Sequence, residues 1–234
     1  MKSALSIVCL TLVSLQPAFS AEKSEIPIGI EAVTGIRSGY IYRGFKLADA
    51  TLDFQVESEV AITDDTFLNI GAWYLAESDG DVAENGIFLD LRHAIGEKLI
   101  LGGSILYRHF DHPVFDSGLD TGVSVSYRIN DEWDWKTTAS YDFGADGFYT
   151  STDLHWSHVI NESSFIAVLG GLSAVTDYYG RDGLNDFYYR LSYTYAISDR
   201  VALTPFVGGS VVIEDEGYLA ENEAYAGFWF EVNF

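Results

Sequence analysis

Charged side chains alternate with apolar ones along several segments of this chain, and both signs of charge occur among them. One such segment carries Asp53, Glu57 and Glu59, a second carries Arg128, and a third carries Asp134. Opposed rows of carboxylates and bases create a transverse field that orders water and favours polar over apolar solutes. These residues therefore predict the lining of an aqueous pore. The predicted pore-lining residues are Arg37, Arg43, Asp53, Glu57, Glu59, Asp90, Arg92, Arg108, Asp120, Arg128, Asp134, Lys136, Asp142, Arg190 and Glu231.

The same charges allow two other interpretations. Long side chains of opposite sign can pair with one another and fill the interior, so that the charges only keep the structure in shape. The basic residues alone would suit a track for anions or acidic oligosaccharides, but carboxylates are as numerous on these rows. The whole chain has 13 Lys and Arg against 35 Asp and Glu, a net charge of −22. This sign excludes nucleic acid as a partner.

Residues that could catalyse a reaction or bind a metal are few. His155 and Ser157 share one face of a predicted strand, but no third group completes a nucleophilic triad by its spacing. Asp79-Gly80-Asp81 offers oxygen ligands without the full spacing of a calcium loop. We therefore predict no enzymatic activity, no catalytic residue, no cofactor and no specific metal site.

Alternation with period two predicts the strands that position the charges. Residues 118–129 place Leu119, Val123 and Ile129 on one face, and Asp120 and Arg128 on the other. Segments 52–62, 133–143, 187–197 and 223–234 repeat this pattern. Weaker runs near 28–44, 67–76, 86–95, 99–109, 148–159, 165–176 and 201–213 bring the expected total to about twelve strands.

A short turn motif recurs between these strands. It reads Ile62-Thr63-Asp64-Asp65, Ile95-Gly96-Glu97-Lys98, Ile129-Asn130-Asp131-Glu132, Ile160-Asn161-Glu162-Ser163 and Ile197-Ser198-Asp199-Arg200. The opposite strand ends are expected to be joined by longer loops, near 45–50, 77–85, 110–117, 144–147, 177–186 and 214–222. Short periplasmic turns, longer outer loops and a final Phe234 are typical of an outer-membrane β-barrel.

Aromatic residues favour a membrane barrel over a soluble β-sandwich. The chain has 15 Tyr, 15 Phe and 5 Trp, and many lie near predicted strand ends, where interfacial girdles occur. The opposite rows are charged, so they could not form the dry interior of a sandwich. The predicted fold is therefore an all-β, transmembrane, antiparallel barrel of about twelve strands.

The N-terminal residues 1–20 have the features of a signal peptide. Lys2 is followed by an apolar stretch that contains Cys9, the one cysteine of the chain, and then by the small-x-small sequence Ala18-Phe19-Ser20. Residues 21–234 are expected to form the barrel domain. The expected location is the outer membrane, reached through the periplasm.

A motif near the first strand resembles a known family. Ser38-Gly39-Tyr40-Ile41-Tyr42-Arg43-Gly44 resembles the S-x-Y-x-x-R-G motif that opens the TorF family of porins, and residues 67–73 are similar to that family's second hairpin. The resemblance covers about a fifth of the chain. It implies a bacterial outer-membrane barrel of the porin class.

These observations predict a passive porin for small hydrophilic solutes, weakly selective for cations because its outer loops are acidic. Glu77, Asp79, Asp81 and Glu84 fall in one such loop. The main alternative is a non-conducting structural or adhesive barrel. A lipid-modifying barrel enzyme is a second alternative that the sequence supports less. Expected partners are outer-membrane lipid and lipopolysaccharide, the barrel insertion machinery and small hydrophilic solutes; the sequence assigns no oligomeric state.

The orientation can be tested with inserted epitope tags. We expect tags at Asp79 or Glu216 to be labelled by antibody on intact cells and tags at Asp131 or Glu162 to need permeabilised cells, because short turns face the periplasm in such barrels. The reverse labelling pattern would overturn every outer and periplasmic assignment.

Overall fold

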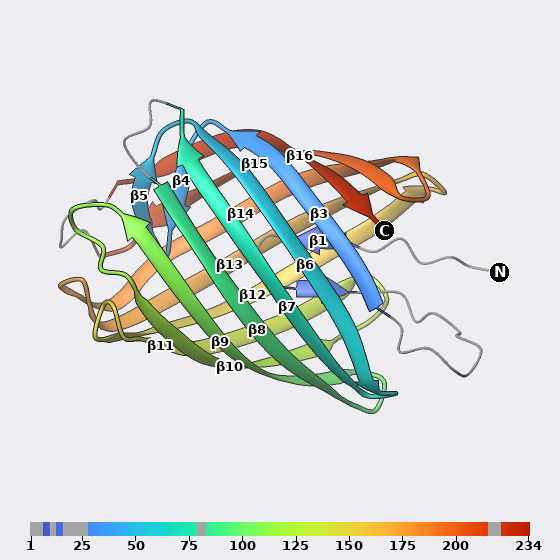
Figure 1. The fold of residues 1–234 in the computed structure, drawn as a ribbon, viewed down its shortest axis with the longest axis horizontal. Coiled ribbons are helices and arrows are strands. Elements are labelled where there is room, and N and C mark those ends of the chain that lie inside the picture. Colours follow the sequence, from blue (N-terminus) through green and yellow to red (C-terminus); the bar gives the residue numbers. More distant parts are fainter. Residues whose placement is uncertain (1–6, 10–12, 16–27, 79–82, 215–220) are drawn as a thin grey trace.

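The computed structural model describes residues 7–9, 13–15, 28–78, 83–214 and 221–234, and its main feature is one closed ring of strands. Twelve antiparallel strands form this barrel, each paired with its neighbours along the ring, and β16 closes on β3 (Figure 1). The strands are β3 (Ile28–Arg37), β6 (Thr51–Thr63), β7 (Thr66–Glu77), β8 (Ala83–Ile95), β9 (Leu99–Asp111), β10 (Gly118–Arg128), β11 (Trp133–Asp142), β12 (Gly147–Asn161), β13 (Ser164–Tyr178), β14 (Arg181–Ser198), β15 (Val201–Val212) and β16 (Glu223–Asn233). The predicted all-β fold and its strand number are confirmed.

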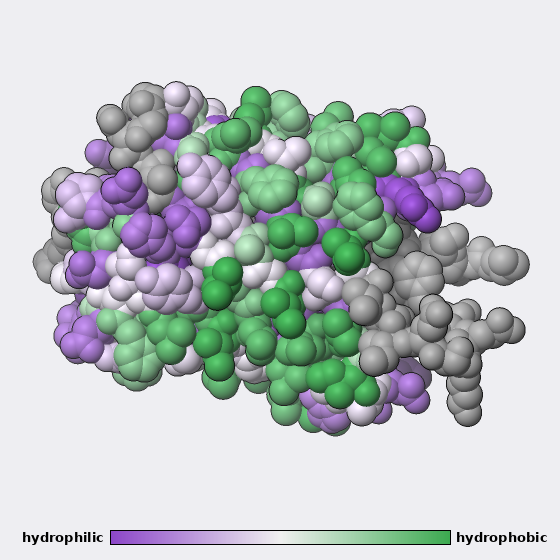
Figure 2. All heavy atoms as spheres, viewed as in Figure 1, coloured by the Kyte–Doolittle hydropathy of each residue, from purple (hydrophilic) through white to green (hydrophobic). Residues whose placement is uncertain are grey.

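The outer surface of the barrel is apolar. Large side chains that would be buried in a soluble protein are open here, among them Ile87, Val123 and Val159, which are 63%, 64% and 66% exposed. Figure 2 shows hydrophobic residues over the middle of the barrel and hydrophilic ones gathered toward its ends. An apolar band with polar ends matches a bilayer. In the described part of the chain, no helix is long and apolar enough to cross a membrane.

The five predicted turns all join neighbouring strands at one end of the barrel, which we call the turn end. Side chains cap several of them; Asn130, for example, accepts hydrogen bonds from the backbone N–H groups of Glu132 and Trp133 at 2.9 and 3.0 Å. Such local bonds satisfy backbone groups that have no ladder partner. Each copy of the motif is therefore a tight turn between two strands, as predicted.

The loops at the opposite end, the loop end, differ from the prediction in three places. The predicted loop 45–50 is mostly strand, since β5 spans Phe45–Ala48. No long loop spans 177–186. β13 continues to Tyr178, β14 begins at Arg181, and these two residues pair with each other. Glu84 is not a loop residue either, because β8 already begins at Ala83. Residues 79–82 and 215–220, which carry Asp79, Asp81 and Glu216, lie outside the described residues.

The predicted first strand over 28–44 is wrong in its second half. β3 ends at Arg37, and the chain then forms a separate hairpin of β4 (Tyr40–Tyr42) and β5 (Phe45–Ala48), which pair only with each other. Arg43 and Gly44 form its turn, with φ angles of 49° and 80°. Two positive φ angles are the mark of a type I′ hairpin turn, which glycine adopts readily. Figure 1 shows β4 and β5 at the loop end of the barrel.

Large aromatic side chains of the inner wall lie directly beside glycines of the adjacent strand. The directly opposed pairs are Trp73 with Gly86, Phe88 with Gly71, Tyr188 with Gly171 and Trp229 with Gly35. A side chain at any of these glycines would overlap the facing ring. Glycine thus lets bulky rings occupy a lumen that they would otherwise overfill.

At the N-terminus, β1 (Ile7–Cys9) and β2 (Val13–Leu15) form a small antiparallel pair of their own. The proposed cleavage sequence at residues 18–20 lies outside the described residues, so the signal peptide and the boundary at residue 21 stay predictions.

The glycine and aromatic packing predicts that Gly86→Val lowers the free energy of unfolding by about 1–3 kcal/mol, the usual cost of overpacking. The reason is that a Cβ at Gly86 would overlap the ring of Trp73 and lie 2.6 Å from the carbonyl oxygen of Tyr107. Urea unfolding of the barrel in detergent, followed by tryptophan fluorescence, measures the change. Gly103→Val is the matched control, since Gly103 is exposed and nothing lies within 4 Å of its would-be Cβ. An equal loss in both variants would contradict this account.

Candidate functional site in the lumen

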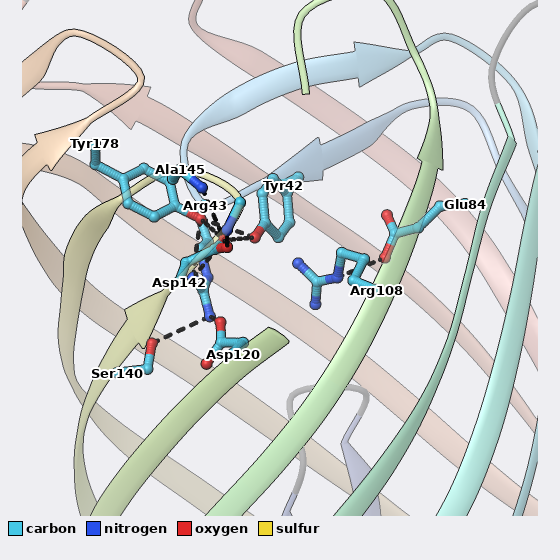
Figure 3. A network of polar contacts seen from close by, with 10 residues as sticks. Tyr42, Arg43, Glu84, Arg108, Asp120, Ser140, Asp142, Ala145 and Tyr178 are labelled. Carbon is cyan, nitrogen blue, oxygen red and sulfur yellow. Dashed lines mark hydrogen bonds and ion pairs between the residues drawn. The ribbon is translucent and has the colours of Figure 1, made fainter. Parts of the chain in front are cut away.

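The β4–β5 hairpin crosses the barrel from the wall on which it is rooted to the opposite wall. It leaves β3, and its turn contacts β10 and β11; β11 lies six strands from β3 in either direction around the ring. At the turn, Arg43 donates to Tyr178 at 2.9 Å and to Ser140 at 3.2 Å, and pairs with Asp120 and Asp142 (Figure 3). The guanidinium is therefore bonded to three barrel strands at once.

Tyr42 adds a second polar contact beside Arg43. Its hydroxyl lies 3.0 Å from a carboxylate oxygen of Asp142 and 2.8 Å from the hydroxyl of Tyr178, which is itself 2.8 Å from the same oxygen. Burial raises the pKa of Tyr42 to about 12. The phenol therefore stays protonated at neutral pH and can donate to the carboxylate.

The backbone of the turn is also held. Asn185 donates its side-chain N–H to the carbonyl oxygen of Arg43 at 2.8 Å, and Arg181 donates to that of Gly44 at 3.2 Å. The Arg181 guanidinium stacks on the ring of Phe45, with its carbon 3.7 Å from the ring centroid. These contacts satisfy carbonyl groups that a tight turn leaves without partners, and they bring in β14.

Apolar packing completes the plug, a name we use for the hairpin residues 40–48. Phe45 is fully buried, and it packs with Tyr42 and Leu47 against side chains of the barrel end. Those partners are Phe110, Phe115, Val175 and Tyr178. Ring pairs such as Phe45 and Phe115, 5.5 Å apart and nearly perpendicular, have the favoured edge-to-face geometry.

Glu84 of β8 is the centre of a second network that contacts the hairpin. It is 1% exposed and accepts hydrogen bonds from Tyr40 at 2.5 Å and from Trp73 at 2.9 Å. Arg108 pairs with it at 3.1 Å and lies over the ring of Tyr42. Figure 3 shows Glu84 and Arg108 beside the Arg43 cluster. The hairpin therefore also contacts β8 and β9, and β9 adjoins β10 in the ring.

Most of the residues predicted to line the pore lie on the inward rows, and several of them form ion pairs. Arg37 pairs with Asp53 at 2.7 Å, Arg92 with Glu59, and Arg128 with Asp134 at 3.9 Å. Glu57 accepts from Gln55 at 3.0 Å, Lys136 is in register with Asp153, and Asp90 with Asn69. Arg190 lies over the Trp229 ring at 5.1 Å, and Glu231 is buried on β16. Arg43 is the exception, because it belongs to the hairpin and not to the wall.

Below the plug, the two halves of the lumen differ. The half formed by β3 and β13 to β16 is filled by side chains such as Phe165, Phe206 and Trp229, all at most 4% exposed. The inward rows of β9 to β11 carry small side chains that are partly exposed although they face inward: Gly102, Ser104, Gly122, Ser124, Ser126 and Thr138. Water therefore reaches this hydroxyl-lined wall.

The sequence does not single out Tyr42, Tyr178, Arg181 and Asn185 as site residues, and it predicts Glu84 in an acidic outer loop. The one local signal was Arg43-Gly44 within an aromatic stretch, since glycine beside a polar residue marks a turn. Among the described residues, no group of three or more His, Cys, Asp or Glu side chains could hold a metal ion. The candidate ligands Asp79 and Asp81 lie outside those residues.

Comparison with known proteins supports the fold. No model of a protein family matches the chain, and no curated protein matches it in sequence. Three solved structures share its architecture with a TM-score of 0.57. They are the KdgM porin (7% identity, covering 88% of this chain and 99% of that one), the NanC porin (11%, 88% and 98%) and the COG4313 outer membrane channel from Pseudomonas putida F1 (12%, 94% and 100%). The chain is thus similar in fold to outer-membrane porins and channels, while membership of the TorF family stays a prediction.

The burial of Glu84 predicts a large effect of Arg108→Ala on stability. Removing one partner of a buried ion pair costs about 3–5 kcal/mol, because a carboxylate is left without its counter-charge. Arg128→Ala is the matched control, since that pair is 3.9 Å apart and the Arg128 side chain is 49% exposed, where a pair contributes about 0–1 kcal/mol. Urea unfolding in detergent compares the two variants. An equal loss of unfolding free energy in the two variants would show that burial does not determine how much an ion pair contributes to stability.

Proposed function

We propose that the protein is a passive outer-membrane channel for small hydrophilic solutes. The observation that carries the proposal is the wall of β9 to β11, where inward-facing hydroxyl groups and glycines are open to water inside a closed barrel with an apolar exterior. A polar lumen within an apolar band is the physical requirement for passing polar solutes across a bilayer. The porin and channel names of the structural neighbours support the same proposal.

The hairpin limits what this channel can pass. It fills the loop end of the lumen with buried side chains, so the passage is narrow compared with the open channel of a sixteen-stranded porin. The same contacts favour the alternative, a non-conducting structural or adhesive barrel. Current through single molecules in a planar bilayer distinguishes the two, because a structural barrel gives no opening steps.

Acidic oligosaccharides are not the proposed solutes. One neighbour was solved as the KdgM porin in complex with disordered oligogalacturonate, an acidic sugar chain. In the lumen of this protein, Arg37, Arg43, Arg92 and Arg108 each pair with a carboxylate of the barrel wall. Basic residues already neutralised in this way offer an anion little net attraction.

For selectivity we propose a weak preference for cations, set by acidic residues at the loop end. The net charge of −22 supports it, and fixed negative charge at a channel mouth concentrates cations. The proposed environment includes outer-membrane lipid and lipopolysaccharide outside the barrel, with insertion by the barrel assembly machinery. Export by a cleaved signal peptide belongs to the same proposal.

Reversal potentials in a KCl gradient test the selectivity. We expect modest cation preference, reduced when Glu77, Asp79 and Asp81 are replaced together by Gln and Asn, with little change in unit conductance. Glu84 stays unchanged in this variant because it is buried in the lumen network. Raising the salt from 0.1 to 1 M should weaken the preference, since the screening length falls from about 10 to about 3 Å. A strongly anion-selective channel would contradict the proposal.

A further inference from the structure

Asp120 and Asp142 lie directly opposite each other on β10 and β11. Both face the lumen, and they are 5% and 6% exposed. Like charges directly opposite on neighbouring strands destabilise a sheet, and a buried carboxylate needs a counter-charge. A cation between the two carboxylates relieves this repulsion, while Asp142 also accepts from the backbone N–H groups of Gly144 and Ala145 at 2.9 and 3.3 Å.

The cation is supplied by the hairpin and not by the wall. Within the described residues, the ion pairs of Asp120 and Asp142 both go to Arg43. The hydroxyl oxygens of Ser140 and Tyr178 accept from the same guanidinium. The wall thus presents an acceptor set that matches a planar group with several N–H donors.

Among the described residues, backbone–backbone hydrogen bonds join the hairpin that carries Arg43 to the barrel only at its two roots. Its other contacts with the wall involve side chains, as in the ion pair of Lys46 with Glu223 at 3.3 Å. At one root, Ser38 exchanges hydrogen bonds with the backbone of Ala226, at 2.8 and 3.0 Å. At the other, the N–H of Ser78 donates to the carbonyl of Ala50 at 2.7 Å. Between them β4 and β5 pair with each other and with no barrel strand. The hairpin can therefore leave the lumen without breaking any ladder of the barrel.

We propose that the plug is autoinhibitory: Arg43 occupies a wall site that, in the open channel, binds the guanidinium or primary ammonium group of an entering solute. The proposal rests on the channel function above. In the closed state the tethered guanidinium neutralises Asp120 and Asp142 and holds the hairpin across the lumen. A solute with the same cationic group displaces it and frees the hairpin, while the carboxylates keep a counter-charge.

The unmodified protein tests this in planar bilayers. Methylguanidinium chloride and tetramethylammonium chloride are added at millimolar concentration to a KCl background of fixed conductivity. Both cations carry one charge, but only methylguanidinium has N–H donors for the wall site. We expect methylguanidinium to raise the open probability by about fivefold or more, a shift within the usual range of coupled binding, and tetramethylammonium to leave it unchanged.

Variants test the tether itself. Arg43→Ala should open the channel constitutively, and methylguanidinium should raise its open probability no further. Arg43→Lys should remain closed more often than Arg43→Ala, because it keeps the charge without the planar donor group. Arg200→Ala, which removes the same charge from a turn at the opposite end, is the control and should behave as the wild type. A heat-dependent shift of the gel band shows that each variant is folded.

Three outcomes would overturn the inference, and they differ in whether they also reject the channel function. If the wild-type protein opens steadily and neither Arg43→Ala nor methylguanidinium changes its open probability, the channel function stands and the plug proposal fails. If the folded wild type and the folded Arg43→Ala variant both pass no current, the channel function fails as well. Equal responses to the two added cations would reject the wall site.

Discussion

Closure of the strand ladder dictates how polar and apolar residues are divided between the two faces of this barrel. Hydrocarbon offers no hydrogen bonds, so each backbone group in the apolar band must find its partner within the protein. The ladder between β16 and β3, from Gly227 and Arg37 to Asn233 and Glu31, removes the last free edge. With the edges gone, the outer row can be wholly apolar, and the polar residues must turn inward. The charge content of the lumen is therefore a consequence of closure.

The side chains of the twelve-stranded wall do not fill the lumen evenly. Rings lying beside glycines, together with the packed group around Phe206 and Trp229, occupy one half. Small hydroxyl residues leave the other half open to water. A uniform lumen of small residues would give a wide pore, and a uniform lumen of large ones would give a solid core. The asymmetry confines any passage to the wall of β9 to β11.

The hairpin lies across the loop end of the lumen above that wall. Its contacts combine buried ion pairs, hydrogen bonds from Arg181 and Asn185, and an aromatic cluster around Phe45. None of these is a ladder bond, so the strength of the barrel and the strength of the plug are separate properties. The proposed release of the plug requires this separation.

Local patterns in the sequence are enough to predict the barrel. Period-two alternation, five repeated turns and aromatic strand ends are local signals, and they fixed the strand number and the position of the turns because each reflects hydrogen bonding or burial within a few residues. The plug depended on tertiary structure. Its alternating residues look like a continuation of β3, and only the Arg43-Gly44 turn breaks the pattern. Its partners Asp120, Asp142 and Asn185 lie 77, 99 and 142 residues away along the chain. Such long-range pairing is set by barrel curvature and lumen volume, which no local pattern records.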